Sequence, residues 1–191
     1  MMQNLQIFAT PWWVNLAILV PIGSYVVWRK KGLLFSWEQL LYSGLFGIAF
    51  GFNEAVVVVY LRAATGLLSP SSTLYQQVQL LANLPHLFVL TETGREIATL
   101  VILISVSLLA SKERGDRWAL FLWMFAFWDI FYYVGLWLTI QWPYSLLTQD
   151  ILFLVPTPWV SQVWFPILVS ALVITALLLT RKSHSVVSAA K

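Results

Sequence analysis

Five apolar runs, each about the length needed to cross a lipid bilayer as a helix, dominate this sequence of 191 residues. A membrane-spanning helix needs about 20 mostly apolar residues, because the hydrocarbon core of a bilayer is about 30 Å thick and a helix rises about 1.5 Å per residue. Only 10% of the residues are charged, against about 25% in a typical soluble domain. We therefore expect an all-α integral membrane protein that forms a single multi-pass domain over residues 1–191. The predicted spans are 11–28, 40–61, 92–110, 118–140 and 159–180.

The lysine and arginine residues predict the orientation of these spans. Nine of the eleven follow the first span, separate the third from the fourth, or follow the fifth: Arg29, Lys30, Lys31, Lys112, Arg114, Arg117, Arg181, Lys182 and Lys191. Short loops rich in such residues stay on the cytoplasmic side of a membrane. We therefore expect the N-terminus outside, the C-terminus inside and a flexible cytoplasmic tail at 182–191, in a bacterial inner (plasma) membrane.

Two connecting segments are expected on the outer side. The apolar spacing within residues 73–83 predicts a short helix that lies in the membrane interface. Residues 141–158 are too apolar for a solvated loop and too short for a span. A re-entrant or surface-lying segment, with its backbone buried in protein, fits them better. Asp150 lies in this segment and either closes a pocket from above or stays solvated, and the sequence favours the solvated placement.

Several ionisable residues fall inside the predicted spans, where a charge is costly and usually functional. Glu92, Arg95 and Glu96 have the i, i+3, i+4 spacing that places them on one helix face. At about 1.5 Å of rise per residue, Arg95 and Glu96 lie about 5 Å inside the outer end of their span. Glu54 lies about 10 Å and Asp129 about 16 Å inside theirs. None falls in the cytoplasmic half, which predicts one pocket that faces outward.

Neighbouring residues suggest how this pocket is walled. Tyr132 and Tyr133 follow Asp129 by one helical turn, and they either donate hydrogen bonds to a carboxylate or anchor the helix at the membrane surface. Three glycines precede Glu54 on the same helix face: Gly44, Gly47 and Gly51. Glycines at this spacing permit a neighbouring helix to approach closely. We therefore expect Glu54 to point into the bundle.

The predicted pocket holds more acid than base. Its acidic members are Glu54, Glu92, Glu96 and Asp129. Against the single Arg95, a low-dielectric site requires that some carboxyls be protonated or that a cation be bound. The four carboxyls are possible ligands for a divalent metal, to which His86 could add a nitrogen, and the alternative is a structural network in which Arg95 bridges two of them. His86 and His184 are predicted on opposite sides of the membrane, so a bis-histidine haem is not expected.

Three functions remain open. An accessory, assembly or other subunit of a larger membrane system is favoured, because the chain is small and carries no recognised motif. A membrane enzyme is the first alternative, in which the carboxyls act as acid/base groups or metal ligands on a lipid or other apolar substrate. Its candidate catalytic residues are Glu54, Arg95, Glu96 and Asp129. A proton- or ion-coupled transporter is the second alternative. The expected partners are the lipid bilayer and other membrane subunits, but not nucleic acid.

Overall fold

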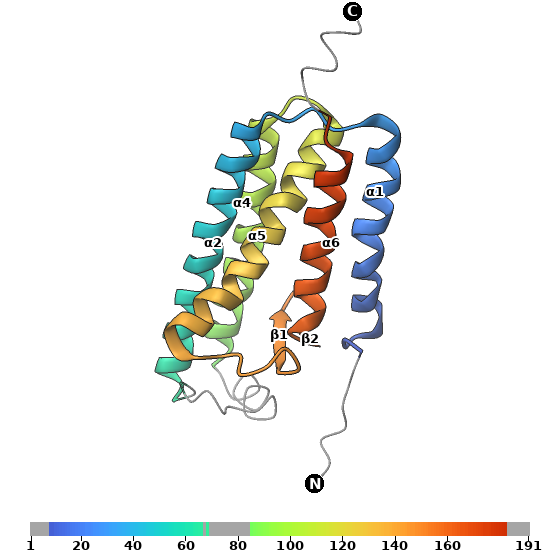
Figure 1. The fold of residues 1–191 in the computed structure, drawn as a ribbon. Coiled ribbons are helices and arrows are strands. Elements are labelled where there is room, and N and C mark those ends of the chain that lie inside the picture. The colour runs from blue at the N-terminus through green and yellow to red at the C-terminus, as the bar shows by residue number, and fades with distance from the viewer. Residues whose placement is uncertain (1–7, 67, 69–84, 183–191) are drawn as a thin grey trace, which may run out of the picture.

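The computed structural model is mostly helical (74%) and describes residues 8–66, 68 and 85–182 (Figure 1). In chain order the elements are η1 (Trp12–Ile18), α1 (Leu19–Lys31), α2 (Trp37–Ala64), α4 (His86–Ala110), α5 (Arg114–Ile140), β1 (Gln149–Phe153), β2 (Trp159–Gln162) and α6 (Trp164–Thr180). The interfacial helix predicted at 73–83, the tail beyond Lys182 and His184 lie outside the described residues.

Three of the helices, α2, α4 and α5, are long and apolar enough to cross a membrane, and α6 is a shorter apolar helix. The helices extend beyond several of the predicted spans. α4 begins at His86 rather than at residue 92, so Glu92 does not lie in its first turn and does not complement the helix dipole there. The predicted span 159–180 is divided between β2 and α6.

α5 lies at the centre of the bundle and α2 packs along it (Figure 1). The glycine face of α2 meets α5 directly. A Cβ atom at Gly47 would lie 2.6 Å from the carbonyl oxygen of Met124, and one at Gly51 would overlap the backbone of Trp128. Backbone therefore approaches backbone here, which only glycine permits. This contact places the following turn of α2, with Glu54, beside the middle of α5.

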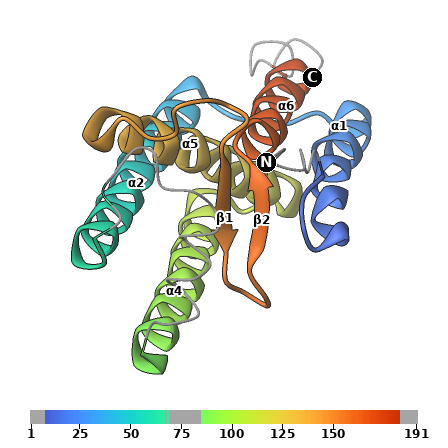
Figure 2. The same cartoon turned by 90° about the horizontal axis from the view of Figure 1, so that it is seen from below.

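The segment between α5 and α6 forms a β-hairpin, which the sequence analysis did not anticipate. β1 and β2 pair antiparallel, with Gln149 opposite Gln162, and Val160 also exchanges two backbone hydrogen bonds with Thr10, at 2.7 and 2.8 Å. An apolar segment can thus satisfy its backbone by strand pairing as well as by forming a helix. The hairpin runs across the middle of one end of the bundle, between α4 and α6 (Figure 2).

The two ends of the bundle differ in character. We call the end with β1 and β2 the hairpin end, and the opposite end, where α1, α4 and α6 finish beside basic residues, the basic end. A buried cluster fills the basic half: Trp28, Leu33, Phe35, Leu40, Leu120, Trp123 and Leu177 are among its members. The chain segments that follow α1 and α6 also join here, through backbone hydrogen bonds of Leu33 with Thr180 (3.2 Å) and Lys182 (2.9 Å). The basic half is therefore closely packed.

Candidate functional site

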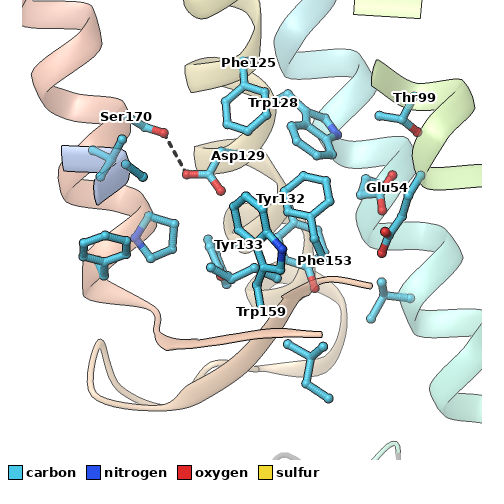
Figure 3. Close-up of a pocket in the computed structure, with 18 of the residues that line it drawn as sticks. Glu54, Thr99, Phe125, Trp128, Asp129, Tyr132, Tyr133, Phe153, Trp159 and Ser170 are labelled. Atoms are coloured by element: carbon cyan, nitrogen blue, oxygen red, sulfur yellow. Dashed lines mark hydrogen bonds between the residues drawn. The ribbon is translucent and has the colours of Figure 1, made fainter. Parts of the chain in front are cut away.

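A cavity of about 150 Å³ occupies the hairpin half of the bundle (Figure 3). Its lining residues come from η1, α2, α4, α5, α6 and both strands. All seven residues that the sequence analysis assigned to a pocket line it: Glu54, Glu92, Arg95, Glu96, Asp129, Tyr132 and Tyr133. Much of the remaining wall is aromatic: Phe125, Trp128, Phe153, Trp159 and Phe165. Ionisable side chains from three helices thus share one largely apolar cavity.

Arg95 joins α2 to α4 on one side of the cavity. Its Nη1 donates to Glu54 Oε2 at 2.5 Å, its Nη2 donates to Glu92 Oε1 at 2.5 Å, and its Nε lies 3.0 Å from both Glu92 oxygens. Glu92 is one turn from Arg95 on α4, so this part of the network is local. The side chains of Arg95, Glu92 and Glu54 are 24%, 20% and 13% exposed. Arg95 therefore bridges two carboxylates from two helices.

Glu96 binds the backbone of the hairpin segment and not a basic side chain of the described residues. Its carboxylate oxygens accept a hydrogen bond from the backbone N–H of Leu154, at 2.9 and 3.1 Å, immediately after β1 ends. Glu96 is buried, and a buried carboxylate needs such donors. This contact ties the tip of the hairpin to α4.

Asp129 lies on the opposite side of the cavity, between α5 and α6. Its Oδ2 accepts a hydrogen bond of 2.8 Å from Ser170 Oγ (Figure 3). Within residues 8–66, 68 and 85–182, Ser170 provides the one hydrogen bond that Asp129 receives, and no basic side chain forms an ion pair with it. Its carboxyl group therefore keeps hydrogen-bonding capacity for a bound molecule.

Asp150 is buried, so the solvated placement favoured by the sequence is wrong. β1 carries it into the bundle, where it is 3% exposed and accepts hydrogen bonds from Tyr133 Oη (3.1 Å) and Tyr132 Oη (3.4 Å). The tyrosines thus donate to Asp150 rather than to Asp129. Burial raises the pKa of Asp150 to about 6, although the nearby Arg62 and the hydrogen bond from Tyr133 act to lower it.

This pKa predicts a pH dependence of stability. Since the pKa of Asp150 is higher in the folded protein (about 6) than its ordinary value of 3.8, the folded state holds the proton more tightly. The stabilisation is complete below about pH 4 and is lost as the pH rises through 6. Between pH 4 and pH 7, the free energy of unfolding of the wild type should fall by up to about 3 kcal/mol relative to Asp150→Asn.

Unfolding in a non-ionic detergent at a series of pH values measures this difference. Glu38→Gln, at an exposed position at the start of α2, is the control, and its curve should stay parallel to that of the wild type. Parallel curves for the wild type and Asp150→Asn would show that the titration of Asp150 does not contribute.

The arrangement of the carboxyls does not favour a metal centre. In the part of the chain that the structure describes, no three His, Cys, Asp or Glu side chains form a group that could hold a metal ion. Glu54 and Glu92 bind Arg95, Glu96 binds the hairpin backbone, and Asp129 binds Ser170. His86 is exposed at the first residue of α4 and does not line the cavity. A metal is therefore not part of the function proposed below.

Sequence reasoning missed the residues that the hairpin and α6 contribute. Ser170 and Trp159 carry no signal in a single sequence, because their roles depend on which helix and strand lie beside α5. For Asp150 a signal existed, since an acid within an apolar segment is costly unless it is paired. Comparison with protein-family models, with curated proteins and with solved structures finds no match to this chain. The functional argument therefore rests on the geometry of the cavity.

Proposed function

We propose that this is a multi-pass membrane protein that binds an apolar molecule in its cavity and acts on it by acid–base chemistry. The observation that carries the proposal is the pairing of an aromatic wall with the carboxyl group of Asp129, which accepts a hydrogen bond from Ser170 and forms no ion pair with the part of the chain that the structure describes. Ligand sites are typically concave, mostly apolar and furnished with a few convergent polar groups. A carboxyl group in such surroundings is a suitable general acid or base.

The orientation that we propose places the hairpin end outside and the basic end in the cytoplasm of a bacterial inner membrane. The apolar helices α2, α4 and α5 and the basic residues at one end of the bundle support this arrangement. In this orientation the first and last helices, η1–α1 and α6, also cross the membrane. The cavity then lies in the outer half of the bilayer, where a lipid-soluble molecule can reach it.

The packing of the basic half argues against transport. The residues that line the cavity lie in the hairpin half of each helix, for example residues 14–17 of η1 and residues 165–170 of α6. On the cytoplasmic side of the proposed orientation, the path is filled by the cluster around Leu120 and Leu177. A subunit or assembly factor, the reading favoured by the sequence, does not require a cavity of this size. Binding of a small apolar molecule does require one.

Lipid analysis of the purified protein tests the proposal. The protein is reconstituted in nanodiscs, and the molecules that remain bound are extracted and identified by mass spectrometry. Val169→Phe places a ring into the cavity, whereas Leu179→Phe adds the same ring at an exposed position on the same helix. We expect one apolar compound enriched over bulk lipid, reduced at least tenfold by Val169→Phe and unchanged by Leu179→Phe.

Asp129→Asn separates binding from chemistry in the same assay. The substitution keeps an acceptor for Ser170 but removes the acid–base group. The compound should therefore still be bound, but the mass spectra should no longer show a product formed from it. Identical lipid profiles for the wild type and Val169→Phe would overturn the binding proposal. Unchanged conversion in Asp129→Asn would overturn the assigned role of Asp129.

A further inference from the structure

Two buried indole groups at the cavity have no hydrogen-bond acceptor within residues 8–66, 68 and 85–182. The Nε1 atoms of Trp128 and Trp159 are inaccessible to solvent and have no partner within the described ranges. Both residues line the cavity, and in Figure 3 both rings lie among its side chains. The indole nitrogen of Trp142 is also unpaired, but Trp142 is not a lining residue. Buried polar groups in proteins are nearly always paired, so two unpaired donors at one cavity require an explanation.

Other tryptophans of the bundle show that this sequence supplies acceptors where it needs them. Trp118 donates to Ser24 Oγ at 3.1 Å, Trp123 donates to the carbonyl oxygen of Leu40 at 2.9 Å, and Trp164 donates to Gln162 Oε1 at 2.7 Å. None of these three lines the cavity. Within the described residues, two of the three unpaired indole groups therefore belong to side chains that line the cavity.

The hydroxyl donors of the cavity are already used within the protein. Ser170 donates to Asp129, Thr99 donates to the carbonyl oxygen of Arg95, and the two tyrosines donate to Asp150. Of the uncharged donors on the cavity wall, the two indole N–H groups are therefore the ones that lack an acceptor within the described residues. An oxygen acceptor on the ligand is what the indole groups lack.

The charge of the cavity determines which kind of oxygen it accepts. Four carboxyl groups line it together with one basic residue, Arg95, and that residue already binds two of them. A phosphate or carboxylate head group would face this excess of acid without a free cation, at a high cost in a low-dielectric site. A neutral oxygen, as in a ketone, aldehyde or quinone, accepts hydrogen bonds without that cost.

We propose that the ligand is a neutral apolar molecule with at least one oxygen acceptor, bound through the indole N–H groups of Trp128 and Trp159. The proposal rests on the function proposed above and specifies its substrate class. It disfavours phospholipids and fatty acids, whose phosphate or carboxylate groups are anionic, and it gives the two tryptophans a role in selectivity. Asp129 lies next to Trp128 on α5 and completes the polar part of the site.

Three probes with the same chain length test this selectivity: 2-octanone, octane and octanoate. Their binding to the protein in nanodiscs is measured by the shift in melting temperature and by isothermal titration. The wild type should bind 2-octanone at least tenfold more tightly than octane or octanoate. In Trp128→Phe and Trp159→Phe, the affinity for 2-octanone should fall at least fivefold while the affinity for octane stays the same.

Trp137→Phe is the control, because Trp137 is exposed on α5 and does not line the cavity. The unchanged affinity for octane also shows that the phenylalanine variants are folded. If octane or octanoate binds as tightly as 2-octanone, or if Trp128→Phe and Trp159→Phe leave the affinity for 2-octanone unchanged, the selectivity proposal is wrong and the cavity remains an apolar site. If the wild type binds none of the three probes, the proposed function fails as well.

Discussion

Gly51→Ala is expected to destabilise the protein more than any other single methyl addition in α2. The new Cβ atom would overlap the carbonyl oxygen of Trp128 and would lie 3.0 Å from the backbone nitrogen of Tyr132. Both are backbone atoms of α5, so the clash cannot be relieved by a change of rotamer. Overpacking costs about 1–3 kcal/mol and occasionally more, and we expect the upper end, about 3 kcal/mol. Reversible unfolding in mixed micelles measures the loss.

Gly94→Ala is the matched control for this prediction. Gly94 also lies within a long helix, α4, but a Cβ atom there would have no neighbour within 4 Å. Alanine is favoured over glycine in a helix interior by about 1 kcal/mol, so Gly94→Ala should be neutral or slightly stabilising. If the two variants unfold alike, α2 and α5 do not make the close contact described above.

Arg95→Met should have the second largest effect. It removes the cation that holds Glu54 and Glu92, and two partly buried carboxylates are left facing each other across α2 and α4. Breaking a buried ion pair from one side costs about 3–5 kcal/mol. Because Arg95 keeps 24% of its side-chain surface exposed, we expect a smaller loss, about 2–3 kcal/mol. The loss should show as a lower midpoint of unfolding in the same micelle assay.

A second substitution tests the cause of this loss. Glu54→Gln removes one of the unpaired charges, so the double variant Glu54→Gln with Arg95→Met should recover part of the stability lost in Arg95→Met. Arg114→Met, at an exposed position at the start of α5, should change stability little. If the stability changes of the two single variants add up to that of the double variant, Arg95 does not act on Glu54. The ion pair between α2 and α4 would then make no contribution to the free energy of unfolding.

Much of the fold and of the cavity lining could be predicted because both depend on spacing within single helices. The length of each apolar run indicates a helix, and the i, i+3, i+4 spacing of Glu92, Arg95 and Glu96 places them on one face. Glu54 follows the glycine face that packs on α5, so it also reaches the cavity. These relations remain the same whatever the neighbouring elements are.

The hairpin could not be predicted in this way. Residues 141–158 form an apolar segment without the alternation that marks a half-buried strand, and their pairing depends on contacts with Thr10 and with the end of α5. The roles that depend on the hairpin were therefore not predicted, among them the contact of Asp150 with the two tyrosines and that of the Leu154 amide with Glu96. Tertiary pairing also decides which indole nitrogens lack an acceptor.

The contact between η1–α1 and α6 affects the order in which the helices can pack during synthesis. Leu33 exchanges backbone hydrogen bonds with Thr180 and Lys182, and Phe35 accepts one from the Arg181 side chain. Val14 of η1 packs against Phe165 of α6 in the wall of the cavity. A ribosome that has not yet released α6 therefore holds a chain whose first helix lacks its main neighbour, although Ser24 of α1 can already bind Trp118 of α5. The part of the cavity wall that α6 supplies is added after the rest, so a nascent chain that stops before α6 lacks Phe165 and the Ser170 partner of Asp129.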